Sequence, residues 1–414
     1  MSAGERALRL RLHGEAVAVI VERGARPRHN YELVFEPSWA EQLQRPVLSL
    51  GALNWRLPTA RAFPGRLPPF LTNLLPERGG AMRRRIARAA ALDEPDDVAF
   101  LRFVGHDMSG AITVEDADAP APSARVIEAG SEYPAEAARL RASFGGIQPK
   151  FSVDRTDRVT LLARGRRGRW ILKVPDVARL DLPRAEYAAM EWARRVGFDV
   201  PALEIIDPRE VEGIPADAVD RVPEALLVRR FDRTDAYEPV HMEEIASALG
   251  MHPEEKYAEL VTSHPEYQLV HVGRLIRRFA GEAGLDAFLR RVVFDVLVGN
   301  GDAHLKNWAF LFPDRRTARL APVYDVVPTT LYGDESGLAL NFAGAQSFRS
   351  IDLRSVGLFA RKVGASPEAC ERAAREVVEA AASTFQEVMA TTGMPEPMRD
   401  RLRDHWQALP IVRG

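Results

Sequence analysis

The segment that most constrains the fold of this chain is FDVLVGNGDAHLKNWAFLF, residues 294–312. Two apolar runs flank a nine-residue loop, GNGDAHLKN, which carries five polar or charged side chains. Polar groups inside a protein core cost free energy unless they are paired. The loop is therefore either a well-satisfied structural turn or a functional site.

Composition places the chain among soluble globular proteins. Its 414 residues are enough for two or three domains, and 46% of them are hydrophobic and 28% charged. No segment approaches the roughly 20 apolar residues of a membrane span, and the first residues carry charges where a signal peptide would be apolar. We therefore expect a cytoplasmic protein without membrane contact. The single cysteine, Cys370, fits a reducing compartment and excludes a Cys-rich zinc site.

The pattern of apolar residues divides the chain into four parts. Residues 1–115 alternate in a way that predicts strands, including two joined by a turn near His13 and Gly14, followed by helices. Residues 116–137 are rich in Ala, Pro and acidic residues and are predicted to be a linker. Residues 138–230 predict strands and one amphipathic helix that starts at Pro183 and ends at Gly197. Residues 231–414 predict helices, including two stretches before Gly299 and a long one near the end. The predicted fold class is α/β (α+β).

Three side chains have the spacing of a phosphoryl-transfer site. Asn307 follows Asp302 by five positions, and Asp325 lies 18 positions further on, in the strand-like run LAPVYDVVP. In such a site one carboxylate accepts the proton of the attacking hydroxyl, while an amide oxygen and a second carboxylate hold Mg²⁺. Each residue alone is more often a helix cap, a turn residue or a salt-bridged core residue. The three together favour the functional interpretation.

Two further elements suit binding of phosphates. Lys173 is predicted on a strand and Glu186 early in the following helix, an arrangement that positions phosphates in protein kinases. The alternatives are a charge at a strand edge and a first-turn acidic residue favoured by the helix dipole. Upstream, SFGGIQPK (143–150) contains Gly145 and Gly146, which let a backbone approach phosphates. By itself this segment is no more than a glycine turn.

Taken in order, the motifs resemble the HipA family of bacterial toxin kinases. The resemblance is carried by SFGGIQPKFSV, WILKVP, RAEY, RRFDR, GNGDAHLKNWAF and APVYDVVP, and by LTNLLPE and FLRFVGHDMSGAI near the N-terminus. It implies a bilobal protein-kinase-like fold with a β-rich N-lobe and an all-helical C-lobe. A small α/β subdomain would precede the two lobes, and the nucleotide would bind between them.

The resemblance also implies roles for individual residues. Asp302 would be the catalytic base, Asn307 and Asp325 would hold Mg²⁺, and Lys173 would contact the phosphates of ATP. Ser143 falls at the position of autophosphorylation. The nucleotide-binding set expected from the patterns and the resemblance is Gly145, Gly146, Lys150, Lys173, Glu186, Arg229, Phe231, His304, Lys306 and Tyr324.

The expected function is that of an ATP- and Mg²⁺-dependent serine/threonine kinase toxin. Its substrate would be a protein such as an aminoacyl-tRNA synthetase. Its partner would be a small helix-turn-helix antitoxin, through which it would meet DNA only indirectly, since the chain's own net charge is −2. Arg229 stands where the family often has Glu, and ERGGAMRRR replaces a shorter acidic turn.

Three alternatives remain open at this point. A small-molecule kinase of the aminoglycoside or choline type uses a similar Asp-x-His-x-x-Asn loop but lacks the SFGGIQPK element and the N-terminal module. A lipid kinase shares the loop style. A non-catalytic scaffold that binds the antitoxin would not need the complete set of catalytic side chains.

Overall fold

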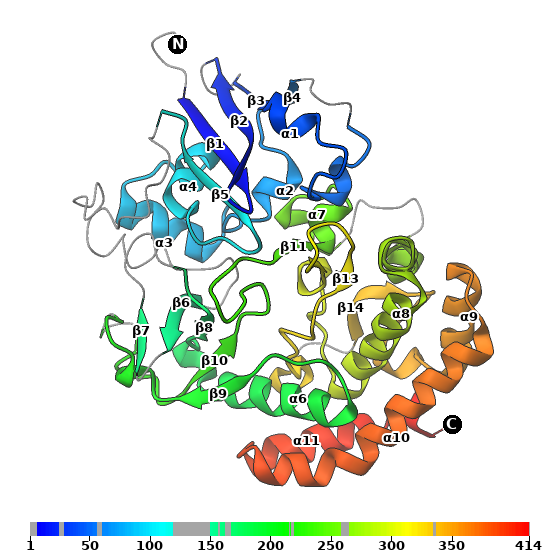
Figure 1. Cartoon of the computed structure of the whole chain (residues 1–414). Helices are drawn as coiled ribbons and strands as arrows, with labels where there is room; N and C mark the ends of the chain where they lie inside the picture. The colour runs from blue at the N-terminus through cyan, green and yellow to red at the C-terminus, as the bar shows by residue number, and fades with distance from the viewer. Residues whose placement is uncertain are drawn as a thin grey trace. The chain divides into compact units, whose positions relative to one another are not determined.

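The computed structural model describes residues 6–413 except 25–28, 56–59, 119–149, 156–157, 162–166, 215, 217–218, 258–264 and 334–336. The chain forms two compact units, drawn in Figure 1. Unit 1 comprises 1–177, 206–254 and 311–316, and unit 2 comprises 178–205, 255–310 and 317–414. Ser143, Gly145, Gly146 and most of the predicted linker lie outside the described residues.

The first sheet of unit 1 is antiparallel. Its strands are β1 (Arg6–Leu12), β2 (Glu15–Arg23), β3 (Asn30–Phe35), β4 (Arg61–Pro64) and β5 (Ile112–Asp116), in the order β4-β3-β2-β1-β5. His13 and Gly14 both have positive φ and join β1 to β2, as the sequence predicts. In β1 the buried residues alternate with partly exposed ones, so one face of the sheet is covered.

The other elements of unit 1 include a second antiparallel sheet. Strands β7 (Val159–Leu161), β6 (Lys150–Arg155), β8 (Trp170–Lys173) and β10 (Ala225–Arg229) pair in that order. The prediction that residues 138–230 contain strands is confirmed. Helices and a short strand complete the unit: α1 (Pro37–Ala40), η1 (Leu50–Ala52), α2 (Pro69–Thr72), α3 (Ala81–Ala90), α4 (Asp97–Val104), η3 (Pro208–Glu210), β11 (His241–Glu244), α7 (Ile245–Ala248) and η5 (Pro253–Glu255).

One hydrophobic cluster runs through both sheets of unit 1. It contains Leu10 of β1 and Ile20 of β2, which are fully buried, together with Phe151 of β6 and Leu172 of β8. The N-terminal sheet and the second sheet therefore share a core, although the sequence predicts a linker between them. The predicted domain boundaries remain predictions.

A buried group of four charges also joins these parts of unit 1. Asp107 accepts hydrogen bonds from Arg230 (2.8 Å) and Arg233 (3.0 Å), and Asp232 accepts from the same two arginines at 2.8–2.9 Å. Gly110 N–H donates to Asp232 at 2.7 Å. Burial opposes ionisation of both acids, but the arginines outweigh it and hold the pKa values of Asp107 and Asp232 below their usual range.

Unit 2 is built around a buried tryptophan. Its helices include α6 (Leu182–Val196), α8 (Gln268–Val298), α9 (Leu353–Val363), α10 (Pro367–Thr391), α11 (Glu396–Gln407) and α12 (Pro410–Arg413). Trp192 of α6 packs edge-on against Phe294 of α8 and Phe385 of α10, with ring centroids 5.3 and 5.1 Å apart. Its indole N–H donates to the Ala381 carbonyl at 3.1 Å. This one side chain therefore joins three helices.

The predicted helix boundaries in unit 2 are largely confirmed. Helix α6 ends at Gly197 with φ 108°, as its sequence indicates. Helix α8 contains a non-helical residue, Gly281, so it consists of the two predicted helical stretches. Ser366 caps α10 by accepting a hydrogen bond from the Ala369 N–H.

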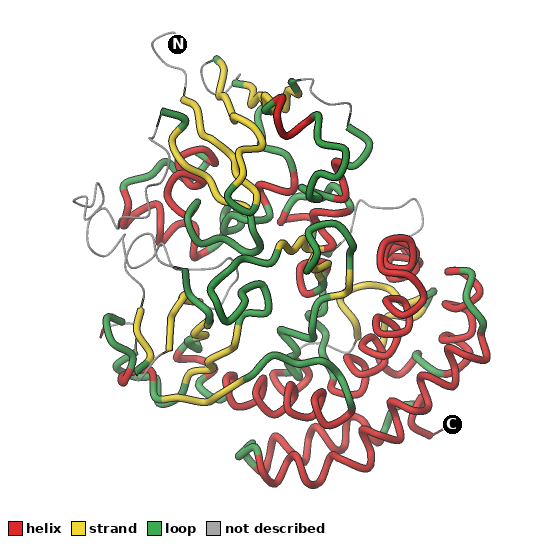
Figure 2. Tube along the Cα trace, viewed as in Figure 1, coloured by secondary structure: helices red, strands yellow, loops and turns green. Residues whose placement is uncertain are grey.

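The expectation of an all-helical C-terminal part is wrong. Residues 231–414 also contain β11, β12 (Ala309–Phe312), β13 (Arg319–Leu320), β14 (Gly337–Phe342) and β15 (Ala345–Ser347); strands are drawn in yellow in Figure 2. Strands β14 and β15 form a hairpin, and Phe342 stacks on Phe359 of α9 with centroids 4.9 Å apart. These strands are short, and their alternation is brief beside the long helical patterns around them.

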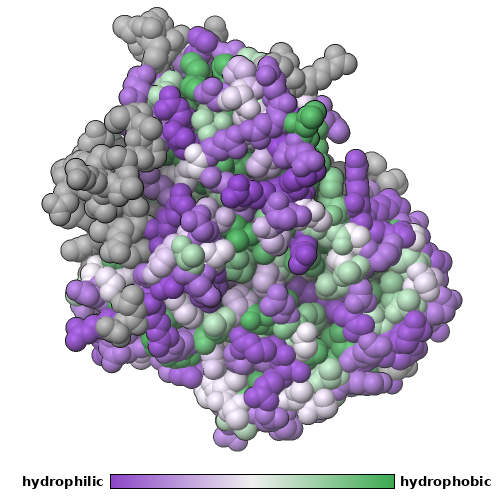
Figure 3. All heavy atoms as spheres, in the orientation of Figure 1, coloured by the Kyte–Doolittle hydropathy of each residue, from purple (hydrophilic) through white to green (hydrophobic). Residues whose placement is uncertain are grey.

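The chain is confirmed as a mixed α/β protein. On the face drawn in Figure 3 hydrophilic residues predominate, with smaller hydrophobic areas between them, as is usual for a protein surface. None of the described helices is long and apolar enough to cross a membrane.

Asp232→Asn tests the buried charge group. The substitution keeps the shape but leaves two buried arginines facing one carboxylate, so we expect the free energy of unfolding to fall by about 3–5 kcal/mol. Urea denaturation followed by tryptophan fluorescence measures it. Asp116→Asn is the matched control, because Asp116 forms an exposed ion pair with Arg102, and it should cost less than about 1 kcal/mol. Equal losses in the two variants would show that the buried group has no special role.

Candidate active site

The polar loop begins where helix α8 ends. Gly299 has φ 69°, a left-handed conformation, and the Asn300 N–H bonds back to the Asp295 carbonyl at 2.8 Å. A Cβ atom at position 299 would also collide with the Thr330 hydroxyl. Glycine is therefore required here for both reasons, and it turns the chain sharply out of the helix.

The loop is closed by hydrogen bonds to one carbonyl. The Asp302 carbonyl accepts from the His304 N–H at 2.8 Å and from Asn307 Nδ2 at 2.9 Å, and the short helix η7 (Leu305–Asn307) follows. Because the nitrogen of the Asn307 amide is used inside the loop, its Oδ1 points the other way. The structure thus brings Asp302 and Asn307 together, with the Asn307 oxygen presented as an acceptor.

Asp325 lies beside this loop but not on a strand. The hydroxyl of Tyr324 donates to the Lys306 carbonyl at 2.9 Å, which joins the segment 324–325 to the segment 306–307. The predicted strand around Asp325 is wrong: β13 ends at Leu320, and Asp325 has φ 52° in an irregular segment. Pro322 and Pro328 lack the N–H that a strand ladder needs. A non-glycine residue held at positive φ is strained and is often found at functional sites.

Three buried polar residues, Asn300, Asp295 and Arg291, bond to one another or to the segments that form the site. Asn300 Nδ2 donates to Asp295 Oδ1 at 2.9 Å, and Asn300 Oδ1 accepts from the Asp302 N–H at 3.3 Å. Arg291, whose Nε lies 3.8 Å from Asp295 Oδ2, donates to the Tyr324 carbonyl at 2.8 Å. These side chains are at most 3% exposed. Asn300 bonds to the backbone of Asp302, and Arg291 bonds to the backbone of Tyr324. The buried side chains therefore connect the residues on the two sides of the site.

Burial raises the pKa of Asp295 to about 6, and the nearby Arg291 and Asn300 only partly oppose this effect. The pKa of His304 is lowered, to about 3. Burial is the main cause, and the positive charges of Lys256 and Lys306 act in the same direction. Asp325 is close enough to counteract this shift. Without a bound ligand, His304 is therefore a neutral imidazole at physiological pH.

Two residues next to the loop were missed by the sequence analysis. The Leu305 N–H donates to the Lys256 carbonyl at 3.0 Å, and the hydroxyl of Tyr257 donates to Asp302 Oδ1 at 2.9 Å. The Tyr257 ring stands edge-on to His304 at 5.4 Å. No pattern in EEKYAEL indicated this contact. By contrast, the Arg291–Asp295 pair could have been found, because two charges four residues apart interrupt an apolar helix.

The remaining described site residues are distributed over both units. In unit 1, Lys150 and Lys173 are directly opposite each other on β6 and β8. Cross-strand partners project on the same face, and like charges there repel unless an anion compensates them. Glu186 belongs to α6 of unit 2 and is 2% exposed. Its predicted pairing with Lys173 stays a prediction.

Arg229 and Phe231, two members of the predicted nucleotide-binding set, lie in unit 1. Arg229 ends β10, and its guanidinium bonds to Asp235 at 2.6 Å and to the Arg169 carbonyl at 3.2 Å. The Arg230 N–H also donates to the Arg169 carbonyl, at 2.8 Å. Phe231 is half-buried. Arg229 therefore has a structural partner of its own, where the family often has Glu.

The oxygen donors suit Mg²⁺. Asn307 offers an amide oxygen held in place by its own nitrogen, and Asp325 offers a carboxylate from the adjoining segment. Within the described ranges there is no cluster of three or more His, Cys, Asp or Glu side chains that would hold a metal by itself. Mg²⁺ is commonly held by one or two protein oxygens together with water and substrate phosphates. This pair fits an ion that arrives with a nucleotide.

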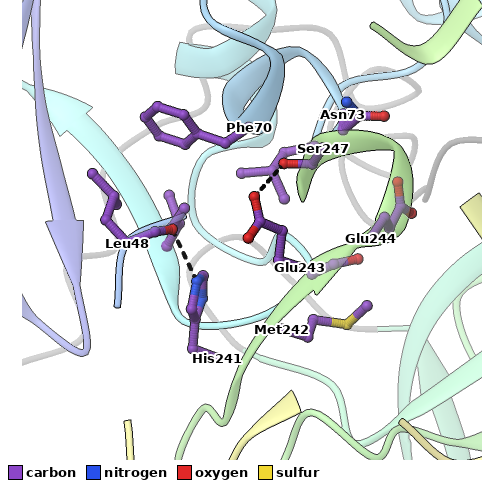
Figure 4. A pocket seen from close by; sticks show the side chains of 11 residues that line it. Leu48, Phe70, Asn73, His241, Met242, Glu243, Glu244 and Ser247 are labelled. Carbon is purple, nitrogen blue, oxygen red and sulfur yellow. Dashed lines mark hydrogen bonds between the residues drawn. The ribbon is translucent and has the colours of Figure 1, made fainter. Parts of the chain in front are cut away.

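A separate cavity in unit 1, drawn in Figure 4, contains none of the predicted site residues. Glu243 lies in it and accepts hydrogen bonds from the hydroxyls of Ser49 and Ser247 (2.6 Å each) and from the Leu50 N–H (2.7 Å). His241 Nε2 donates to the Leu48 carbonyl at 3.1 Å. These bonds join residues 48–50 to β11 and α7, so the cavity belongs to the packing of unit 1.

The raised pKa of Asp295 predicts a dependence of stability on pH. A carboxyl with an ordinary pKa of 3.8 and a folded-state pKa of about 6 binds its proton more tightly when folded. The stability that the protonated Asp295 carboxyl contributes to the fold is therefore fully present below about pH 4 and is lost as the pH rises to about 6. Relative to Asp295→Asn, the wild-type free energy of unfolding should fall by about 2–3 kcal/mol over this range. Asp286→Asn, an exposed carboxylate of the same helix, is the control; a pH-independent difference for Asp295→Asn would contradict the argument.

Comparisons with known proteins show the family to which the chain belongs. A model of the HipA-like C-terminal domain matches residues 142–385, and a model of the HipA N-terminal domain matches residues 8–115. The chain is 32% identical over 420 residues to the Sinorhizobium fredii protein named "Putative kinase Y4dM", covering 98% of each. It is 25% identical over 297 residues to the Shewanella oneidensis serine/threonine-protein kinase toxin HipA, covering 66% of this chain and 65% of that protein.

A solved structure shares the fold. In the Shewanella oneidensis complex of HipA, HipB and operator DNA, one chain aligns with a TM-score of 0.74 and 19% identity, covering 97% of this chain and 96% of the other. The two family models together cover the N-terminal sheet, the lysine pair and the polar loop described above. This chain belongs to the HipA family.

Proposed function

We propose that this protein is an ATP- and Mg²⁺-dependent serine/threonine protein kinase and the toxin of a toxin–antitoxin pair. The arrangement of Asp302, Asn307 and Asp325 carries the proposal. Asp302 and Asn307 belong to one loop, and Asp325 belongs to a segment joined to that loop by the Tyr324–Lys306 hydrogen bond, so a carboxylate, an amide and a second carboxylate are available there. This is the donor set that phosphoryl transfer needs.

Asp302 is the proposed catalytic base. Its carboxylate takes the proton of the acceptor hydroxyl as the acceptor oxygen forms its bond to the γ-phosphorus and the bond from that phosphorus to the β-phosphate oxygen breaks. The leaving electron pair goes to ADP. Mg²⁺, when bound with the nucleotide, neutralises charge on the phosphates, and Asn307 and Asp325 are the residues that would hold it.

The lysine pair of unit 1 supports a role in phosphate binding. Lys150 and Lys173 are cross-strand partners, and Lys173 is 5% exposed. Two ammonium groups on one face of a sheet can interact with the negative charges of the ATP phosphates. Gly145 and Gly146 would add backbone donors, and Ser143 is the proposed autophosphorylation position, although these three lie outside the described residues.

The proposed substrate is a component of translation such as an aminoacyl-tRNA synthetase. The proposed partner is a small helix-turn-helix antitoxin, which would mediate contact with DNA. The structural relative from Shewanella oneidensis was solved with HipB and operator DNA, and this supports the partnership. The complete set of Asp302, Asn307 and Asp325 argues against a purely non-catalytic scaffold.

Asp302→Asn tests the assignment of the base. The amide keeps the size of the side chain and can still accept the hydrogen bond from Tyr257, so the fold should be retained. It cannot take a proton, and we expect transfer of labelled phosphate from ATP to protein to fall about 1,000-fold. Labelling of the wild type, located by mass spectrometry, also tests Ser143. Retained transfer by Asp302→Asn would contradict its role.

Asp325→Ala tests the metal assignment. Loss of one carboxylate should raise the Mg²⁺ concentration at half-maximal ATP turnover by at least about 10-fold. A titration of turnover against Mg²⁺ at saturating ATP measures it. Asp404→Ala, an exposed carboxylate of α11, is the matched control and should not change the Mg²⁺ dependence. An unchanged Mg²⁺ requirement in Asp325→Ala would rule the residue out as a ligand.

A further inference from the structure

Tyr257 makes a side-chain hydrogen bond to the proposed base. Its hydroxyl donates to Asp302 Oδ1 at 2.9 Å, while its ring lies edge-on to His304 with centroids 5.4 Å apart. A neutral donor can bond to a carboxylate without neutralising it, so the base keeps its negative charge. The same bond fixes the direction in which the second carboxylate oxygen points, because the two oxygens are rigidly related.

The backbone around Tyr257 is held from both sides. The Lys256 carbonyl accepts from the Leu305 N–H at 3.0 Å, within the polar loop itself. The Tyr257 carbonyl accepts from Gln268 Nε2 at 3.1 Å, and Gln268 in turn accepts from the Asn341 N–H of β14 at 2.8 Å. Residue 257 is therefore tied to the loop, to α8 and to β14. These bonds hold the backbone from which the partly exposed phenol reaches Asp302.

Two further side chains lie beside the Tyr257 ring. Lys256 is 9% exposed, and its ammonium lies 5.4 Å from the centroid of the Tyr257 ring. The histidine against the same ring is neutral, because burial and the nearby lysines lower its pKa to about 3. The Tyr257–Asp302 hydrogen bond links this segment directly to the base.

We propose that Tyr257 is a positioning residue for phosphoryl transfer, which orients the Asp302 carboxylate toward the acceptor hydroxyl. The inference rests on the proposed kinase function and adds to it a residue outside the polar loop. Tyr257 does not take part in proton transfer itself. Its contribution is geometric: without the bond the carboxylate rotates about its Cβ–Cγ bond, and a smaller fraction of bound complexes is aligned for reaction.

Tyr257→Phe tests the proposal in the full-length protein with Mg·ATP as the probe. Release of ADP is measured, so that the result does not depend on knowing the acceptor. The ring against His304 is kept and only the hydroxyl is lost. We expect kcat to fall about 10- to 100-fold, the loss typical of one hydrogen bond to a charged group, with little change in the KM for ATP. The thermal midpoint should stay within a degree or two of the wild type.

Tyr237→Phe is the matched control. Tyr237 is 37% exposed, against 36% for Tyr257, and its hydroxyl also donates to an aspartate, Asp154, at 2.5 Å. It lies in unit 1 and has no part in the proposed site. The control should keep the wild-type kcat. A merely structural hydroxyl would give the same result at both positions, so equal kcat values for the two variants would overturn the positioning role.

A double-mutant cycle separates this inference from the proposed function. If Tyr257 acts through Asp302, Tyr257→Phe should have no further effect on the residual rate of Asp302→Asn. Independent effects that multiply would overturn the inference while leaving the kinase assignment intact. A wild type that releases ADP no faster than Asp302→Asn would instead overturn the proposed function, and the role of Tyr257 with it.

Discussion

The candidate site depends on a charge pair buried in helix α8. Arg291 and Asp295 are almost completely removed from solvent, and neither could be kept there without partners. Asp295 binds Asn300, which receives the Asp302 N–H, and Arg291 binds the Tyr324 carbonyl. The backbone that carries the proposed base and the backbone next to the proposed metal ligand are therefore held by one polar network. Such a network adds little net stability but strongly favours one arrangement over others.

The same principle operates in unit 1. Asp107, Arg230, Asp232 and Arg233 have zero net charge as a group; the two arginines and Asp232 are buried, and Asp107 is partly buried. They connect the turn at residues 107–110, in the part matched by the HipA N-terminal domain, to the segment that follows β10. The N-terminal module is consequently part of the structure that holds residues 230–233, and not an appendage joined only by a linker. A substitution in the turn at 107–110 would therefore remove hydrogen bonds that hold residues 230–233.

Much of the local structure follows from short-range rules. The hairpin at His13 and Gly14, helix α6 with its terminal Gly197, the interruption of α8 at Gly281 and the cap at Ser366 were all accessible from periodicity and from capping residues. The two errors concern short elements. Strands such as β14 and β15 are fixed by pairing and packing, and the irregular path around Asp325 is set by contacts with a distant loop and by two prolines that flank it.

The amino-acid sequence by itself determined the chemistry available to this protein: a carboxylate, an amide and a second carboxylate at fixed spacings, two lysines, and an apolar frame on either side of the polar loop. These are properties of residue type and order, so they can be read without coordinates. Only the tertiary structure decided that Tyr257 donates to Asp302, that the Asn307 amide nitrogen bonds to the Asp302 carbonyl, and that Arg291 and Asp295 of α8 bond to residues beside the site. The physical reason is that hydrogen bonds act over about 3 Å in space, whereas their partners here are up to 45 residues apart in the chain.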